Sequence, residues 1–149
     1  MTRTVEARKA TLFTPESANR ALLYVKGVVD DLVESCVRLR RAKEARARAL
    51  AGNPSAGATE RERAETLRKA EADRRSAQGD FDRIGRELES VGVTVKDPAI
   101  GLIDFPGEID GRRVLLCWKQ GEERVAFWHD LNAGIAGRRP IPPEAPAAI

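Results

Sequence analysis

The sequence of 149 residues predicts an α+β fold, in which a long antiparallel helical hairpin, similar to a coiled coil, precedes a small antiparallel β-meander of three to four strands. Two observations lead to this expectation. As far as Val91, apolar residues recur at alternating intervals of three and four, which is typical of helices that pack along a seam. After Val93, short apolar stretches separated by turn residues indicate strands instead.

The first helix is expected over residues 14–51. Thr14 is a good N-terminal cap, Pro15 suits the first helical position, and Glu16 favours the positive end of the helix. The stretch AGNPSAGA, which starts at Ala51, contains the glycines and the proline that end the helix. The expected seam comprises Ala18, Leu22, Val25, Val29, Leu32, Cys36 and Leu39.

A second helix is expected over residues 58–91, with Thr59 or a neighbour as its cap and Gly92 as its C-terminal stop. Two seams of similar length joined by a short breaker predict an antiparallel hairpin, with the strongest apolar contacts at its base. The second seam comprises Leu67, Ala70, Arg74, Ala77, Phe81, Ile84, Leu88 and Val91.

Residues 93–139 form the predicted β-lobe, with strands near 101–109, 112–119 and 123–129. Asp110-Gly111 is a strong hairpin-turn signal, and a second turn is expected near Gly121. An extended, proline-rich tail follows over residues 140–149. The whole chain, 1–149, is expected to be one domain.

Side-chain alternation along these strands predicts two partly apolar faces. Leu115 and Cys117 are expected on one face of their strand, and Val125, Phe127 and His129 together on one face of theirs. The opposite face of the middle strand carries Val114, Leu116 and Trp118. We therefore expect the sheet to be covered by the base of the hairpin or by a second copy of the chain.

The composition does not predict a membrane protein. Charged residues make up 33% of the chain, and no apolar run approaches the ~20 residues that a membrane span needs. The N-terminus has no apolar segment of the kind found in secretory signals, so a cytoplasmic location and free thiols at both cysteines are expected.

The basic residues are concentrated in the tip of the hairpin, although the net charge of the chain is only +3. Such a tip can contact RNA phosphates or an acidic protein partner. The segment lacks aromatic residues that would stack on bases, and a solvated helix face is the simpler interpretation. The candidate contact residues are Arg40, Arg41, Arg46, Arg61, Arg68 and Arg75.

A ligand pocket is the second candidate site, and it centres on the only histidine, His129. His129 would orient a ligand or transfer a proton, Asp104 would be its partner, and Arg138 would bind an anion, between apolar walls formed by Trp118 and Trp128. The simpler interpretation is a structural histidine that ends a strand and packs beside Trp128.

No catalytic residue, metal site or cofactor is predicted. Cys117 is the available thiol nucleophile, but only a facing register of its strand and that of His129 would bring the two together. One histidine without a CxxC pair does not predict a zinc site of the usual kind.

Three stretches together resemble a known family: FTPESANRALL, GVTVKDPAIGLIDFP and LCWKQGEERVAFWHDLNAGIAGRRPI. They are similar to the bacterial domain-of-unknown-function family 2203, over nearly the whole chain. The resemblance implies a small cytoplasmic bacterial protein with a helical part and a C-terminal β-part. It implies no activity and no catalytic residues.

The leading functional hypothesis is a non-catalytic assembly or adaptor module that acts through the hairpin and the β-lobe as a homodimer. One alternative is a protein that binds a small anionic ligand, or a minor enzyme, with a pocket around His129. Another alternative is a protein that contacts RNA through the basic tip. The chain is therefore not expected to be an enzyme, although the pocket hypothesis leaves that question open.

Overall fold

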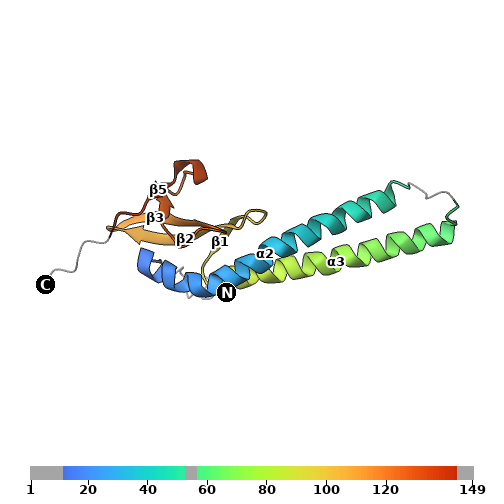
Figure 1. Cartoon of the computed structure of the whole chain (residues 1–149), viewed down its shortest axis with the longest axis horizontal. Coiled ribbons are helices and arrows are strands. Elements are labelled where there is room, and N and C mark those ends of the chain that lie inside the picture. Colours follow the sequence, from blue (N-terminus) through green and yellow to red (C-terminus); the bar gives the residue numbers. More distant parts are fainter. Residues whose placement is uncertain (1–11, 53–56, 144–149) are drawn as a thin grey trace, which may run out of the picture.

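A computed structural model describes residues 12–52 and 57–143 of the protein. Two long helices, α2 (Pro15–Leu50) and α3 (Glu60–Ser90), precede a five-stranded antiparallel sheet. The helices pack against each other in an extended arm, and the sheet lies beside the N-terminal part of α2 (Figure 1). The predicted α+β class is confirmed.

Both helices begin at the expected caps. The Thr14 hydroxyl accepts a hydrogen bond from the Ser17 N–H (3.1 Å), and the Ser17 hydroxyl accepts one from the Thr14 N–H (2.9 Å), so each side chain caps the other residue. The Thr59 hydroxyl accepts from the Glu62 N–H in the same way (3.1 Å). Gly92, at a φ of +90°, follows the end of α3 as expected for a helix stop.

The buried stripe of α2 differs from the predicted seam in two respects. Ser35 is buried where Cys36 was expected, and Val28 is buried beside Val29. The reason is that α2 contacts both α3 and the sheet, so it buries a wider stripe than a two-helix seam requires. In α3 only Ala77 and Leu88 are buried, because this helix is covered mainly by α2.

The strands follow one another in sequence order across the sheet, as in a meander. Asp110 (φ 51°) and Gly111 (φ 78°) form the two-residue turn between the second and third strands, as predicted. The strands are β1 (Thr94–Asp97), β2 (Leu102–Ile109), β3 (Arg112–Lys119), β4 (Phe127–His129) and β5 (Arg139–Pro140), with a short 3-10 helix η1 (Ile135–Gly137) before β5.

The last part of the sheet departs from the expected strands. β4 begins only at Phe127, because the Asn19 side chain takes up both backbone groups of Val125: its Oδ1 accepts from the Val125 N–H (2.7 Å), and its Nδ2 donates to the Val125 carbonyl (3.1 Å). Val125 therefore points into the core, away from the face that carries Phe127 and His129. Arg139 and Pro140 add a fifth strand, whereas residues 144–149 of the predicted tail lie outside the described residues.

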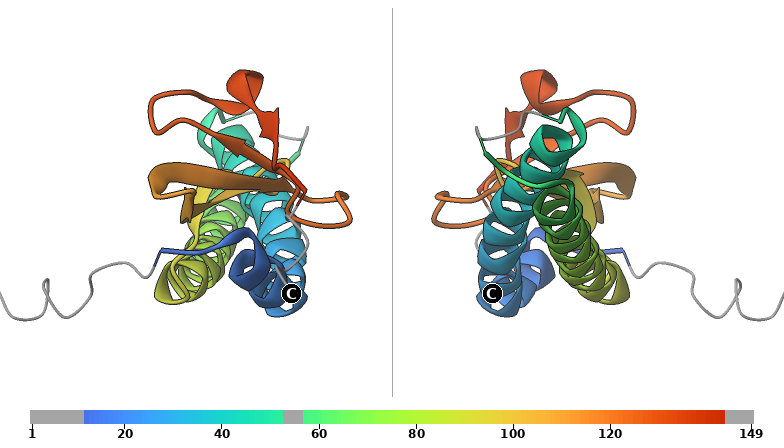
Figure 2. Two further views of the ribbon diagram at one scale, coloured as in Figure 1. Left: turned by 90° about the vertical axis from the view of Figure 1, so that its left-hand side faces the viewer. Right: turned by 90° about the vertical axis from the view of Figure 1, so that its right-hand side faces the viewer.

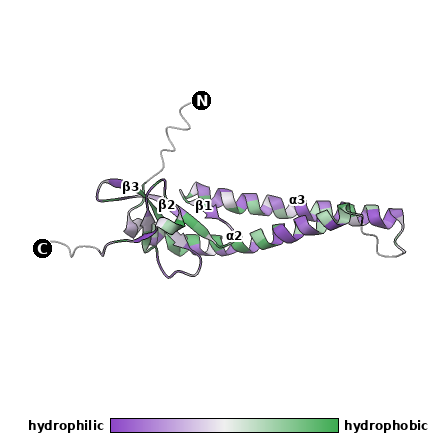
Figure 3. Ribbon diagram, turned by 90° about the horizontal axis from the view of Figure 1, so that it is seen from above, coloured by the Kyte–Doolittle hydropathy of each residue, from purple (hydrophilic) through white to green (hydrophobic). Residues whose placement is uncertain are grey.

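The core lies between α2, the end of α3 and one face of the sheet. This inner face presents Ile103, Phe105, Val114, Leu116 and Trp118, all of them buried. Figure 3 shows hydrophobic residues concentrated on the strands and the adjoining part of α2, and hydrophilic residues prevailing along α3. Within the described ranges, neither helix is long and apolar enough to cross a membrane.

Gly107 of β2 provides a test of this packing. A Cβ atom at this position would lie 2.7 Å from Leu116 Cδ1 and 2.8 Å from the Phe13 carbonyl oxygen, which is too close for either contact. We expect Gly107→Ala to lower the free energy of unfolding by about 1–3 kcal/mol, measured by urea denaturation.

Gly79→Ala is the matched control, because a Cβ atom there meets nothing within 4 Å and the residue lies inside α3. This substitution should leave stability unchanged or raise it by up to about 1 kcal/mol. Equal urea midpoints for Gly107→Ala and the wild type would contradict the packing described for β2.

Candidate functional site

The register of three neighbouring strands brings Asp104, Cys117 and His129 together. Asp104 of β2 lies opposite Cys117 of β3, and His129 of β4 lies opposite Leu115, two residues from Cys117 on the same strand. Because side chains alternate between the two faces of a strand, all three project from the face opposite the apolar core.

This cluster is buried although it lies on the outer face. The exposed fractions are 0% for Asp104, 1% for Cys117 and 3% for His129. Figures 1 and 2 show the helices on one side of the sheet and the segment after β4, including η1, on the other side. Three groups that could carry charge therefore share a site from which water is largely excluded, and such groups are costly to bury unless they are paired.

Hydrogen bonds orient the His129 ring. Nδ1 lies 2.9 Å from the Asp130 carbonyl oxygen, which can only accept, so Nδ1 carries a proton and donates it. Nε2 lies 3.2 Å from Asp104 Oδ1. The other carboxylate oxygen, Asp104 Oδ2, is buried without a hydrogen-bond partner among the described residues, and Lys96 Nζ lies 4.0 Å away from it.

The environment of Cys117 does not favour a nucleophile. Burial and the negative charge of Asp104 raise the pKa of the Cys117 thiol to about 12. Reactive cysteines have lowered pKa values, because the thiolate is the nucleophilic form. The thiol, carboxylate and imidazole are nevertheless a metal-ligating set: one donor atom from each residue lies within 4.8 Å of the other two.

The five residues expected to line a ligand pocket are only partly brought together. Asp104 and His129 meet, but Trp118 and Trp128 belong to the other face of the sheet. The Trp118 indole N–H donates to the Glu122 carbonyl (3.0 Å), and the Trp128 ring lies 5.5 Å from the Arg112 guanidinium. The tryptophans therefore form no walls around His129.

Arg138, the expected anion-binding residue, is engaged within the protein. Its Nη2 donates to Glu122 Oε1 (2.7 Å), and its guanidinium lies 4.2 Å from the centre of the Phe127 ring. Although burial opposes ionisation, the hydrogen bonds from Arg138 and from the Lys119 N–H hold the pKa of Glu122 below its ordinary value. This ion pair lies beside Cys117, whose carbonyl also accepts from Arg138 (3.4 Å).

The six arginines expected to form a basic contact surface are distributed along the arm. Arg46 forms an ion pair with Glu71, and Arg68 forms one with Glu65. The other four (Arg40, Arg41, Arg61 and Arg75) are exposed. Near the tip, a cleft of about 440 Å³ separates the two helices; we call it the tip cleft, and it is lined by Arg46, Leu50, Ala64, Leu67, Arg68, Glu71 and Arg75.

Reasoning from the sequence did not group Cys117 with Asp104 and His129, although a signal was present. A two-residue turn at Asp110-Gly111 pairs the flanking residues in a defined register, and this register places Cys117 opposite Asp104. The position of His129 had no such signal, because irregular residues precede β4 and decide where it joins the sheet.

These observations define a class of protein: a helical-arm α+β protein whose small meander buries an Asp-Cys-His cluster on its outer face. The family model of the uncharacterised conserved proteins DUF2203 matches residues 11–141, so the chain belongs to this family. No curated protein and no solved structure matches the chain.

The two cysteines should differ sharply in reactivity toward a disulfide reagent such as DTNB. Cys36 is half-buried on α2, whereas Cys117 is buried and, with a pKa of about 12, holds about one thiolate in ten thousand at pH 8. We expect one fast thiol in the folded protein and a second only after unfolding, with the slow reaction accelerating as the pH rises. Cys36→Ser should remove the fast phase, and two equally fast thiols would contradict this environment for Cys117.

Proposed function

We propose that this protein is a non-catalytic adaptor whose arm binds an acidic amphipathic helix of a protein partner. The observation that carries the proposal is the tip cleft, where apolar side chains are accessible among arginines. Leu50 is 54% exposed there, whereas the apolar residues at the base of the same helix that face the sheet are buried. An apolar groove with a basic rim suits the apolar face and the carboxylates of such a helix.

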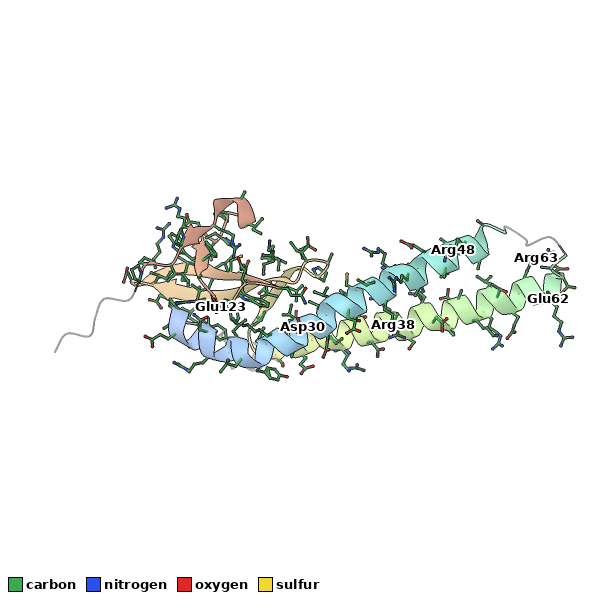
Figure 4. All side chains as sticks on the ribbon, in the orientation of Figure 1. Asp30, Arg38, Arg48, Glu62, Arg63 and Glu123 are labelled. Atoms are coloured by element: carbon green, nitrogen blue, oxygen red, sulfur yellow. The ribbon has the colours of Figure 1, made fainter. Side chains whose placement is uncertain are left out.

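The position of the tip cleft also supports an adaptor. The helices contain 36 and 31 residues, so at 1.5 Å per residue the arm is about 50 Å long. Figure 4 shows Arg48, Glu62 and Arg63 at the far end, well away from the sheet. A partner held at this end leaves the surface of the β-lobe free for a second contact, which is what an adaptor requires.

The tip cleft favours a protein partner over RNA. Phosphate contacts need only lysine and arginine side chains, whereas the tip cleft also presents apolar side chains. The exposed leucine has no role in binding a phosphate backbone. A small anionic ligand at His129 has less support, because the His129–Asp104 pair is buried and Arg138 is paired with Glu122.

The proposed adaptor acts in the cytoplasm of a bacterial cell as a homodimer, with coiled-coil packing in its arm. The dimer is open to direct measurement by light scattering on the purified full chain. A mass of two chains that persists on dilution agrees with the proposal, and a strict monomer at high concentration contradicts the dimer.

Binding can be tested with a fluorescent synthetic helix that carries leucines on one face and glutamates on its flanks. We expect fluorescence anisotropy to show saturable binding to the full chain, persisting at raised salt because apolar burial is little affected by screening. Leu50→Glu should weaken binding at least tenfold, about 1.4 kcal/mol. The substitution places a negative charge, of the same sign as the glutamates of the synthetic helix, in the apolar part of the tip cleft.

Leu23→Glu is the matched control. Leu23 is also an exposed leucine of α2, 84% exposed, but it lies near the base of the arm, so this substitution should leave the affinity unchanged. Equal effects of the two substitutions would contradict a site at the tip cleft. Tighter binding of an unstructured RNA that is abolished by salt and unaffected by Leu50→Glu would replace the proposal with the RNA alternative.

A further inference from the structure

We propose that Asp104, Cys117 and His129 bind one zinc ion that joins strands β2, β3 and β4 on the outer face of the sheet. This site is independent of the adaptor function, because it lies in the β-lobe and the tip cleft lies at the other end of the arm. A thiolate, an imidazole and a carboxylate are the three side-chain types that zinc prefers in proteins.

The spacing of the donor atoms is close to what the ion requires. Zinc-to-ligand bonds of 2.0–2.3 Å with tetrahedral angles place ligand atoms about 3.3–3.8 Å apart. His129 Nε2 and Asp104 Oδ1 are 3.2 Å apart, and the whole set of three donor atoms lies within 4.8 Å. Closing the cluster around an ion therefore needs side-chain movements of about 1 Å, which rotamer adjustments supply.

The surroundings of the donors also fit a metal site. The His129 Nδ1–H donates to the Asp130 carbonyl, and this contact leaves Nε2 facing the cluster, which is the usual outer hydrogen bond of a metal-binding histidine. Asp104 Oδ2 is buried without a hydrogen-bond partner in the described part of the chain, so it is available as a further donor. The three side chains supply three of the four tetrahedral positions, and a water molecule would take the fourth, as in other zinc sites with three protein ligands.

Charge balance supports a divalent cation in particular. One carboxylate and one thiolate neutralise a dication, so the loaded site would bury no net charge. A bound cation also deprotonates a thiol that is otherwise protonated at neutral pH. Two cations lie near the donors. Lys96 Nζ is 4.0 Å from Asp104 Oδ2, but its side chain is 47% exposed, so its ammonium can turn toward water when the site fills. The Arg138 guanidinium beside Cys117 is already neutralised by Glu122.

The test uses the full chain, purified without a histidine tag, unfolded with a chelator and refolded with zinc or cobalt alone. We expect one bound zinc per chain by elemental analysis and a rise in Tm of about 5–10 °C at free zinc about 100-fold above Kd. Cobalt should give the visible bands of a tetrahedral ion and a thiolate-to-cobalt charge-transfer band.

Cys36→Ser is the decisive variant, because Cys117 is then the only thiol in the chain. A charge-transfer band in this variant identifies Cys117 as the ligand without altering a buried residue. Cys117→Ser and His129→Gln should each weaken zinc binding at least 100-fold. The proposal would be overturned if refolded Cys36→Ser gave no charge-transfer band with cobalt. It would also be overturned if neither the zinc content nor the Tm of the protein responded to added zinc.

Discussion

The structure depends on the apolar contact between α2 and the inner face of the sheet. Leu22, Val25 and Val29 are almost completely buried because the helix has the sheet on one side and α3 on another. At about 25 cal/mol per Å² of apolar surface removed from water, such positions dominate the stability of a small domain. The Asn19 side chain completes the contact by hydrogen bonding both backbone groups of Val125, which ties the chain before β4 to the helix.

This contact makes the two faces of the sheet chemically different. The inner face takes the apolar side chains, so the alternate residues must project outward, where Asp104, Cys117 and His129 are buried by a segment that contains little regular structure. Polar groups in such a place are tolerated only when they find partners. His129 has two hydrogen-bond partners, the Asp130 carbonyl and Asp104 Oδ1. The second carboxylate oxygen, Asp104 Oδ2, has no hydrogen-bond partner among the described residues. On the outer face, the packing of the lobe therefore does not by itself explain why these polar groups are buried.

The burial of apolar side chains in the arm decreases from its base to its tip for a related reason. At the base, α2 is covered from two sides and buries valines and leucines, whereas toward the tip the helices cover only each other, with alanines and ion pairs such as Arg46–Glu71 between them. Exposed and partly exposed ion pairs contribute little to stability, so the tip is held mainly by helix propensity and by continuity with the base. A surface of this kind can rearrange around a partner at a small cost in free energy.

The sequence by itself determined the features that depend on local interactions. The Thr14 and Thr59 caps, the stop at Gly92 and the Asp110-Gly111 turn lie where expected, because each requires only neighbouring residues. Tertiary structure decided the rest. Ser35 is buried in place of Cys36 because α2 faces two partners, and β4 is shortened because Asn19 binds Val125 across 106 positions of the chain. The burial of the Asp104–Cys117–His129 cluster likewise depends on how the segment after β4 covers the sheet, and no local sequence pattern specifies that tertiary contact.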